Sequence, residues 1–501
     1  MLLLGLDVGT TGAKAAVFDE NGEMVGYGFE EYGVICDESG LAEQNGEQVW
    51  ESVKRVILSA SAGNGEKIAA LSLSVQGDAV LPIDRDFNPL MNVQLGMDYR
   101  GGAQVKQAEK RMGGRRLFVM TGMRPHPMNS LIKILWIKDR RPEIFEKTWK
   151  FVTYSEFILG KLGAETPMID LTMATRTMAM DLVKLEWSET ICSELGVKKE
   201  LLSIPVASGT VVGKIRRQLA EELGLNHHML LVAGAHDQVC AAVGAGVVLP
   251  GKALDSHGTA EVISTVLENS RTDDKMYSSY FPCYAFADKS KYFTFSLNHT
   301  AGILYQWFIE GFCGSDRTAA EESGERLYEY VLKKTKDAPS SMIVLPYFNG
   351  SGTPECDLDA KGMIAGLTLT ANRYDIARAI MESLAYSMRE NIERMREIGI
   401  PIEKLHCVGG GARSPIGLQM KADILGLPVQ TLKIREAACL GAAVLAGIGT
   451  GKYSGVEDAQ GLVRMGTAYY PRKEMLALYD EKYRQYQELY QINRDLLHRI
   501  K

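Results

Sequence analysis

Cysteine is sparse in this 501-residue sequence, and its eight cysteines are widely separated. The two closest, Cys283 and Cys313, are 30 residues apart, so no CxxC pair and no zinc-ribbon spacing occurs. Dispersed cysteines in a long chain indicate reduced thiols, which are typical of the cytoplasm. A disulfide-stabilised scaffold is therefore excluded, and we expect a cytoplasmic location.

The sequence also lacks a strong charge of one sign and a long hydrophobic run. Its formal net charge of −6 gives no electrostatic reason to expect nucleic acid or an anionic membrane as a partner. The apolar start at 1–6 ends at Asp7, and we expect it to be too short for a signal peptide or a membrane span. The hydrophobic share of 46% and the length predict a globular protein of two or three domains.

Strand and turn signals open the chain. Residues 2–6 and 13–18 are apolar enough for two buried strands, which a Gly/Thr turn, Asp7–Gly12, joins. An Asn-Gly pair at 21–22 supplies the positive φ angles of a tight hairpin and predicts a third strand at 24–27. A Walker loop requires Gly-Lys-Ser/Thr at the start of a helix, whereas this turn leads into a hairpin, so the P-loop fold is excluded.

The opening pattern recurs half a chain later. Asp7 precedes Gly9-Thr10 in the first copy, and Asp255 precedes Gly258-Thr259 in the second copy, which begins 248 residues downstream. Both turns lie between apolar segments. The repeat therefore predicts two halves that open with the same strand–turn–strand unit.

The boundary between the halves is expected in the Gly/Val/Pro stretch 244–251, which gives domains at 1–246 and 247–501. Helical and strand patterns alternate throughout, as in the α/β fold class. The clearest helical pattern covers 370–398, with one apolar stripe. A tyrosine stripe at 479–490 predicts packing against another element or a partner subunit.

Three segments carry groups suited to phosphate chemistry. Asp7–Thr11 combines a carboxylate at a strand end with exposed amides and hydroxyls, although an ordinary Asx turn is an equal alternative. The apolar strand 230–235 delivers Asp237 to its carboxyl end, as a general base or alternatively as a helix N-cap. The three glycines Gly409–Gly411 would permit the backbone to approach a flat ligand closely, or alternatively they form a tight turn. From the residues alone these alternatives stay open.

These segments, in this order, resemble the FGGY carbohydrate kinases, the family of glycerol kinase, xylulokinase and ribulokinase. The likeness spans essentially the whole chain and is most specific at Gly362–Leu367 followed by Asp375–Glu382, which match the family's C-terminal signature. Val408–Ser414 with Gln419–Gly426 resembles the family's adenosine segment. The resemblance implies an α/β fold of two ribonuclease-H-like domains, of the actin, hexokinase and Hsp70 type, around an ATP cleft.

By the same resemblance, ATP and Mg²⁺ are the expected cofactors, and Asp237 is the expected catalytic base. Asp7 and Asp237 would hold the metal directly or through its water. The residues expected to bind ATP and its phosphates are Asp7, Thr10, Thr11, Lys14, Gly258, Thr259, Gly302, Gln306, Gly410, Gly411 and Ser414.

The resemblance is less complete at the acceptor pocket. Gln76-Gly77-Asp78 lies where xylulokinases carry Gln-Met-His and glycerol kinase carries Gln-Arg-Glu, and it matches neither. Met128 replaces a substrate tyrosine of glycerol kinase, which argues against glycerol. Asp78 can accept hydrogen bonds from two vicinal hydroxyls, as suits a neutral polyol. The residues expected to bind substrate are Gln76, Gly77, Asp78, Asp98, Arg100 and Gln238.

The expected function is ATP-dependent phosphorylation of a hydroxyl on a small sugar or polyol, with a ketose such as xylulose favoured. Ribulose, L-xylulose, an erythritol-type polyol and glycerol are alternative acceptors. A non-catalytic sugar or nucleotide sensor is the alternative from another class, but the presence of both Asp7 and Asp237 favours an enzyme. The expected partner is the small-molecule substrate, and a homodimer is a possible assembly.

Overall fold

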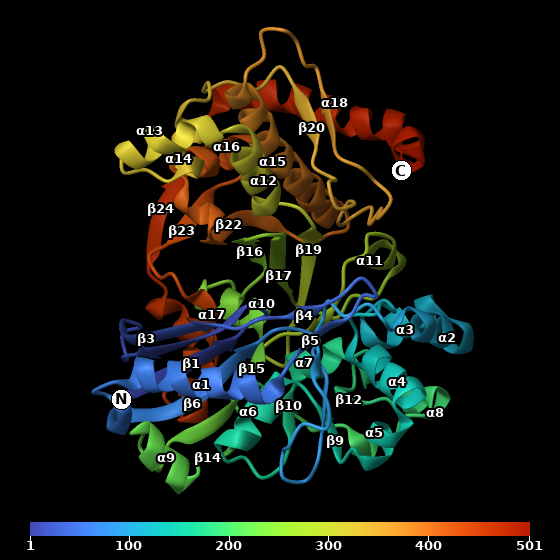
Figure 1. Ribbon diagram of the computed structural model, residues 1–501, viewed down its shortest axis with the longest axis vertical. Helices are drawn as coiled ribbons and strands as arrows, with labels where there is room; N and C mark the ends of the chain where they lie inside the picture. The colour runs from blue at the N-terminus through green and yellow to red at the C-terminus, as the bar shows by residue number, and fades with distance from the viewer. Residues whose placement is uncertain (501) are drawn as a thin grey trace.

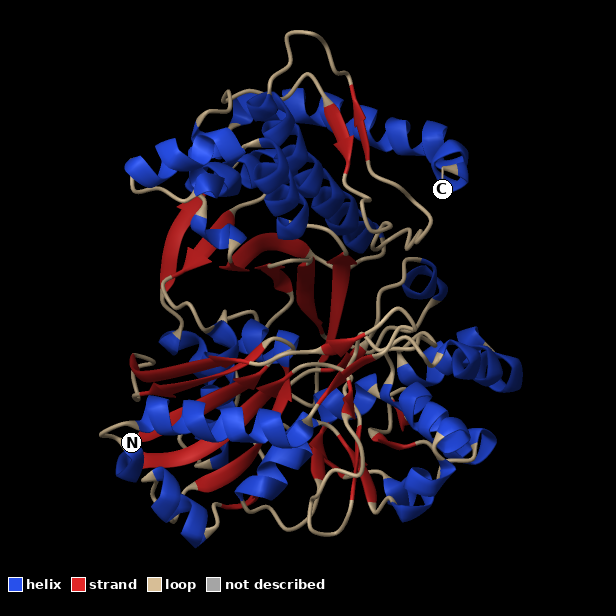
Figure 2. Cartoon of the chain, in the orientation of Figure 1, coloured by secondary structure: helices blue, strands red, loops and turns tan. Residues whose placement is uncertain are grey.

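The computed structural model describes residues 1–500 and shows two α/β halves, one above the other, each around its own mixed sheet (Figure 1; Figure 2). The strands of the first sheet are β1 (Leu2–Val8), β2 (Gly12–Phe18), β3 (Met24–Glu31), β6 (Ile68–Val75), β14 (Val211–Lys214) and β15 (Leu230–His236). Those of the second sheet are β16 (Gly251–His257), β17 (Glu261–Leu267), β18 (Tyr284–Ala285), β19 (Tyr292–Asn298), β22 (Ile402–Gly409), β23 (Val429–Leu432) and β24 (Met465–Tyr469). The strand orders are β14-β15-β6-β1-β2-β3 and β18-β19-β17-β16-β22-β23-β24.

Both sheets are built in the same way around a central hairpin. In the first sheet, β1 pairs antiparallel with β2 and parallel with β6, which lies parallel to β15. In the second sheet, β16 pairs antiparallel with β17 and parallel with β22, which lies parallel to β23. Antiparallel β3 and β19 then extend the two sheets beyond the hairpins. The expected duplication of two ribonuclease-H-like units is therefore confirmed.

The two copies of the Asp…Gly-Thr pattern are displaced by one residue in the structure. The last residues of the paired central strands are Val8 and His257, so the counterpart of Asp7 is Ser256 and not Asp255. Because successive side chains in a strand point to opposite faces, this displacement sends the Asp255 side chain into the interior. The two aspartates therefore have different surroundings, although the sequence pattern presents them as equivalent.

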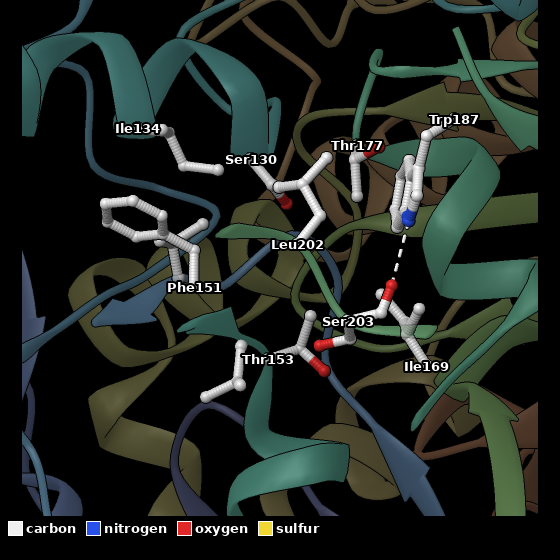
Figure 3. A pocket seen from close by; sticks show the side chains of 11 residues that line it. Ser130, Ile134, Phe151, Thr153, Ile169, Thr177, Trp187, Leu202 and Ser203 are labelled. Carbon is white, nitrogen blue, oxygen red and sulfur yellow. Dashed lines mark hydrogen bonds between the residues drawn. The ribbon is translucent and has the colours of Figure 1, made fainter. Parts of the chain in front are cut away.

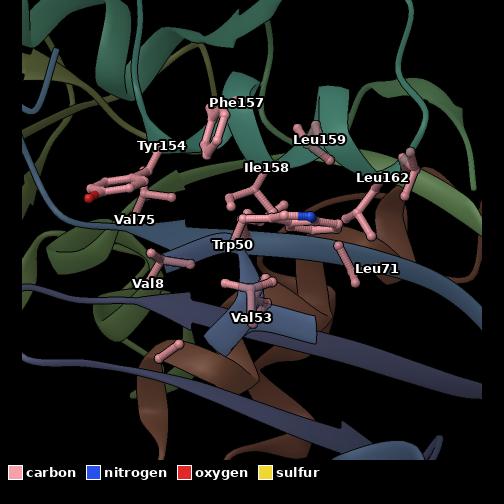
Figure 4. Packing of buried hydrophobic residues seen from close by; sticks show 14 of the residues in the cluster. Val8, Trp50, Val53, Leu71, Val75, Tyr154, Phe157, Ile158, Leu159 and Leu162 are labelled. Carbon is pink, nitrogen blue, oxygen red and sulfur yellow. The ribbon is translucent and has the colours of Figure 1, made fainter. Parts of the chain in front are cut away.

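One face of the first sheet is covered by α1 (Gly46–Ser61) and α6 (Tyr154–Leu162). The side chain of Asn45 accepts a hydrogen bond from the Gln48 amide and so caps the start of α1. Figure 4 shows Trp50 and Val53 of α1 and Phe157 of α6 packed over the side chains of this sheet. This layer is the core of the first half.

The opposite face of the first sheet is covered by α17 (Ala437–Gly449), although this helix comes from the second half of the chain. It packs along α10 (Asp237–Gly244), which in turn contacts β16 and β17 of the second sheet (Figure 1). A Cβ added at Gly441 would lie 1.9 Å from the Cys240 carbonyl oxygen, and one at Gly244 would lie 1.9 Å from the Ala437 carbonyl oxygen. The two halves are therefore joined by a helix pair in backbone contact.

The upper half is built on α12 (Gly302–Phe312), α15 (Arg373–Glu397), α16 (Pro415–Leu425) and α18 (Lys473–Arg499). The helix expected at 370–398 is confirmed, and it begins at Arg373 because the Asn372 side chain accepts hydrogen bonds from the Tyr374 and Asp375 amides. The tyrosine stripe of α18 is buried, and three of its rings pack around Tyr386 of α15. The packing interpretation of the stripe is therefore confirmed within one chain.

A side unit of short helices extends the first half at the right of Figure 1. Its helices are α2 (Gly102–Met112), α3 (Gly114–Thr121), α4 (Ser130–Arg140), α5 (Pro142–Lys147) and α8 (Glu189–Leu195). A further helix, α7 (Leu171–Arg176), connects this unit to β15 and to β18. Across residues 1–500 no helix combines the length and the apolar character that crossing a membrane requires.

The backbone contact between α10 and α17 generates a prediction about stability. Substituting Gly441→Ala should lower the free energy of unfolding by about 1–3 kcal/mol, because the new methyl group overlaps the Cys240 carbonyl and forces the helices apart. Gly455→Ala is the matched control, since a Cβ at that position meets nothing within 4 Å. Equal urea-unfolding midpoints for the two variants would contradict the role of this contact.

Candidate active site

The Gly/Thr turn between β1 and β2 is fixed by hydrogen bonds to the side chains of two glutamines. The Thr10 hydroxyl donates to Gln76 Oε1 at 2.8 Å, and Gln76 Nε2 donates to the Gly9 carbonyl at 3.1 Å. Gln44 Nε2 donates to the Thr10 carbonyl at 2.7 Å, while Thr11 stays exposed. The side chain of Gln76, expected at the acceptor, is thus occupied in bracing the phosphate turn.

Asp7 is the carboxylate at the end of β1. Its Oδ1 accepts a hydrogen bond from the Ser74 hydroxyl at 2.7 Å. Burial raises the pKa of Asp7 above its ordinary value, and the Ser74 hydrogen bond and the charge of Lys14 only partly oppose this rise. Lys14 itself lies 2.9 Å from Glu436, the residue before α17. A phosphate at the turn would therefore meet a lysine that α17 already holds in place.

Asp237 lies where β15 ends, as expected, but it is the first residue of α10 and not its N-cap. His236 Nε2 lies 3.1 Å from its Oδ1, and the Gln238 amide donates to the same oxygen at 2.6 Å. The side chain is recessed yet 34% exposed. Burial raises the pKa of Asp237 to about 7, assisted by the negative charge of Asp7 and opposed by Arg176.

The two carboxylates fit a divalent cation. Within residues 1–500 no cluster of three or more His, Cys, Asp or Glu side chains is arranged for a metal. Mg²⁺ does not require such a cluster, because it keeps several waters and binds one or two carboxylates together with phosphate oxygens. Asp7 and Asp237 repel each other enough to raise the pKa of Asp237, and a cation between them would relieve that repulsion.

The expected substrate residue Asp78 is fully buried and already paired. Its two carboxylate oxygens accept hydrogen bonds from Nε and Nη2 of Arg176, each at 2.9 Å. The guanidinium also lies over the ring of Tyr284 at 5.0 Å. Gly77 leaves room for this arrangement, since a Cβ there would lie 2.8 Å from His236 Nε2 and 3.0 Å from Arg176 Nε. Asp78 therefore offers no free edge to vicinal hydroxyls, and Arg176 is buried beside it with Nη1 left without a hydrogen-bond partner among the described residues.

Asp98 and Arg100 form a second ion pair beside the pocket. Arg100 Nε donates to Asp98 at 3.0 Å, and the guanidinium also contacts Glu43. Asp98 is buried and accepts a hydrogen bond from the Ala42 amide at 3.1 Å. By contrast, Gln238 Oε1 is buried without a partner among the described residues, so it is available to a ligand.

A small cavity of about 20 Å³ lies between α4 and the strands at 150–152 and 168–170 (Figure 3). Ser130, whose hydroxyl donates to the Asp78 carbonyl at 3.4 Å, lines it on one side. Trp187 lines the other side, and its Nε1 donates to the Ser203 carbonyl at 2.8 Å. This space holds about one water molecule and is too small for a sugar.

The second Gly-Thr turn rests on the start of α12. The Gly302 amide donates to the Gly258 carbonyl at 3.1 Å, and the Ala301 amide donates to the Thr259 carbonyl at 3.1 Å. Gly258 and Thr259 remain exposed, with the Gly302 backbone close beside them. Gln306 lies one turn further along α12, exposed, with its side chain bonded to Glu310 at 2.9 Å.

The glycine segment after β22 lies beside the same turn. Gly410 is exposed, and Gly411 packs against the ring of His257. Ser414 is buried, where its hydroxyl caps α16 by accepting from the Gly417 amide at 3.2 Å and donates to Glu329 at 3.2 Å. The expected nucleotide residues of the second half therefore converge, but the Ser414 hydroxyl is committed to the helix.

Comparison with known proteins assigns this geometry to a family. Residues 2–244 match the N-terminal domain of the FGGY family of carbohydrate kinases, and residues 255–450 match the C-terminal domain of the same family. The chain belongs to the FGGY family of carbohydrate kinases. This result confirms the resemblance seen in the sequence, and the protein is therefore a phosphotransferase.

Individual FGGY relatives match along nearly the whole chain. The xylulose kinase of Bacillus subtilis is 29% identical over 499 residues, which cover 99% of this chain and 97% of that one. The gluconokinase of the same organism is 28% identical over 472 residues, covering 93% and 91%. The crystal structure of a ligand-bound xylulose kinase from Lactobacillus acidophilus superposes with a TM-score of 0.88 at 25% identity, covering 98% of both chains.

Sequence reasoning missed a chain of hydrogen bonds that supports the end of β15 in this FGGY kinase. The Thr172 hydroxyl accepts a hydrogen bond from the His236 amide at 2.8 Å and donates to Asp170. Asp170 caps α7, is fully buried, and keeps Oδ2 without a partner among the described residues. Burial raises the pKa of Asp170 to about 7. The only local sequence signal for this chain was the Asp-x-Thr pattern at 170–172, with its aspartate in the capping position of a short helix.

The raised pKa of Asp170 predicts how stability depends on pH. The folded protein binds a proton at Asp170 up to about pH 7, whereas the unfolded chain releases it near pH 3.8. The stabilisation that this proton gives the folded state is therefore complete below pH 3.8 and is lost as the pH rises from there through about 7. Asp170→Asn keeps a capping side chain without the charge, so wild type should lose roughly 2 kcal/mol relative to this variant between pH 5 and 8.

Urea unfolding of both proteins across that pH range measures the difference. Asp86→Asn, an exposed substitution in the same half, is the control and should follow wild type at every pH. Parallel pH profiles for wild type and Asp170→Asn would show that Asp170 does not ionise in this range.

Proposed function

We propose that this FGGY kinase transfers the terminal phosphoryl group of ATP to a hydroxyl of a small ketose such as xylulose. The observation that carries the proposal is the partly exposed Asp237 at the end of β15. Burial raises its pKa to about 7, and the charges of Asp7, Arg176 and Asp78 all act on it. The relation to xylulose kinases supports a ketose as acceptor. A cytoplasmic location and a homodimer remain predictions from the sequence.

Asp237 acts in this proposal as the general base. A carboxylate with a pKa near the working pH can accept a proton from a hydroxyl that reacts and release it after turnover. The hydroxyl oxygen bonds to the γ-phosphorus as its proton passes to Asp237, the bond to the β–γ bridging oxygen breaks, and ADP leaves. When bound at Asp7 and Asp237, Mg²⁺ would supply positive charge beside the phosphates.

The phosphate contacts come from both halves in this proposal. The turn after Asp7 and the exposed Thr259 present backbone amides to the triphosphate, since turn amides bind anions without a net charge. The Gly258 amide donates instead to the Ala260 carbonyl at 3.0 Å. Lys14 adds a cation that Glu436 holds at 2.9 Å. Gly302, Gln306 and the glycine segment at 409–411 would then line the nucleoside.

An aldonate such as gluconate is a second candidate acceptor, and one observation favours it. Nη1 of Arg176 is buried without a hydrogen-bond partner among residues 1–500. A carboxylate is a stronger acceptor for a guanidinium than a hydroxyl is. The gluconokinase relatives are consistent with this candidate. Acceptor assays with xylulose and gluconate separate the two possibilities.

A coupled ADP-release assay tests the activity and the base together. We expect wild type to release ADP with one acceptor from a panel of xylulose, ribulose, gluconate, erythritol and glycerol. Asp237→Asn should keep ADP binding but lose roughly 10²- to 10⁴-fold in kcat, because a positioned base contributes about that factor. Asp86→Asn, which is exposed, is the matched control and should keep full activity.

Two outcomes would contradict the proposal. Wild-type ADP binding without turnover of any acceptor would favour the sensor that the sequence left as an alternative. A folded Asp237→Asn variant with near-normal kcat would remove Asp237 from the mechanism.

The ion pair with Asp78 gives Arg176 a testable role in acceptor binding. Arg176→Lys keeps the positive charge but loses the planar fork, so the KM for the acceptor should rise by about tenfold or more while the KM for ATP stays unchanged. Thermal melting controls for loss of folding. A raised KM for ATP with an unchanged acceptor KM would place Arg176 at the nucleotide instead.

A further inference from the structure

A cluster of four ionisable side chains is buried beneath the second Gly-Thr turn. Lys421 Nζ lies 2.6 Å from Asp255 Oδ2 and 2.7 Å from Glu261 Oε1. His257 Nδ1 lies 2.8 Å from the same Glu261 oxygen and 3.3 Å from Lys421 Nζ. We call these four residues the turn cluster. They come from β16, β17 and α16, so the cluster ties the turn to the helix that follows the glycine segment.

The turn cluster contains two carboxyl groups and one lysine beside the His257 ring. Its carboxylates are Asp255 and Glu261, and its fixed cation is Lys421. Burial alone would raise the pKa of Glu261. The contacts with Lys421 and His257 outweigh the effect of burial and hold that pKa well below its ordinary value, so Glu261 is ionised. Burial raises the pKa of the other carboxyl, Asp255, and the charge of Lys421 opposes that rise.

The ring of His257 is only 5% exposed and is held in one orientation. Nδ1 lies between Glu261 Oε1 at 2.8 Å and Lys421 Nζ at 3.3 Å, and these two contacts fix the ring on that side. On the other side the ring lies against Gly411, where an added Cβ would come within 2.3–2.5 Å of ring atoms. Nε2 lies 4.0 Å from the position that a Cβ would take at Gly302, and no described residue forms a hydrogen bond with it.

His257 Nε2 thus opens between the two glycine segments that frame the nucleotide region. Gly302 lies on one side and Gly411 on the other, and Gly258 follows directly in the chain. Although the ring as a whole is buried, Nε2 itself is not enclosed, so water or a ligand can reach it. The same position is close to the exposed amides of the turn, which favour an anion.

We propose that His257 is a nucleotide-binding residue whose Nε2–H donates to a phosphate oxygen of bound ATP or ADP. The inference rests on the proposed use of ATP and adds a side-chain contact from the second half of the chain. Lys421 and Glu261 act as positioning residues, because they hold the ring through Nδ1 and do not face the ligand.

The test compares substitutions that remove or retain a donor at Nε2. His257→Leu fills similar space without a donor, whereas His257→Gln places an amide N–H near the original position of Nε2–H. Binding of ADP with Mg²⁺ is measured by isothermal titration calorimetry, which requires no acceptor sugar. His228→Gln, in an exposed turn of the first half, is the matched control.

The Kd for ADP should rise about tenfold in His257→Leu, the loss expected for a hydrogen bond to a charged group, and about threefold or less in His257→Gln. His228→Gln should bind ADP as wild type does. A folded His257→Leu variant that binds ADP with the wild-type Kd overturns the inference. Wild-type ADP binding without acceptor turnover would contradict the proposed function alone, since the comparison of variants remains valid.

A measurement on the wild-type protein covers the case in which substitution at His257 prevents folding. Deuterium exchange at the C2 position of each histidine ring, mapped by peptide mass spectrometry, responds to the protonation and accessibility of that ring. The exchange rate at His257 should change when ADP and Mg²⁺ are added, while the rate at His228 stays constant. An unchanged rate at His257 under saturating ADP overturns the inference.

Discussion

The backbone contact between α10 and α17 is the constraint on which the active site depends. Gly244 and Gly441 lie so close to facing carbonyls that no side chain fits between the helices. Because α10 begins at Asp237 and α17 follows Glu436, the partner of Lys14, one helix pair positions both the proposed base and one wall of the phosphate turn. A shift between the halves would therefore move these groups together.

Some carboxylates of this protein form an ion pair with a buried arginine or lysine, and others do not. Asp78 and Asp255 are matched by Arg176 and Lys421, and such pairs fix geometry because removing one partner leaves an uncompensated buried charge. Asp237 has no such partner, and burial raises its pKa to about 7. Unpaired carboxylates with raised pKa values are typical of catalytic sites. Asp170 also has a raised pKa but is fully buried, whereas the side chain of Asp237 is 34% exposed, so accessibility distinguishes the proposed base from the groups that support it.

The sequence predicted what depends on local patterns. The opening strands, the Asn-Gly hairpin, the helix at 370–398 and the duplication are confirmed, because each depends on spacing within a short segment. The pairs between Asp78 and Arg176 and between Asp255 and Lys421 were not predictable, since 98 and 166 residues separate the partners. The one-residue displacement of Asp255 and the packing of α17 on the first sheet likewise depend on tertiary register, which no local pattern records.

The most direct test of the central claim is a crystal structure of the protein with Mg²⁺, a non-hydrolysable ATP analogue and the acceptor found by the activity assay. The account predicts that an Asp237 carboxylate oxygen lies about 2.6–3.2 Å from one acceptor hydroxyl, within the reach of a general base, and that this hydroxyl faces the γ-phosphorus. The triphosphate should contact the turn after Asp7 and the turn at Gly258-Thr259. An acceptor bound away from Asp237, or a triphosphate that contacts neither turn, would contradict the account.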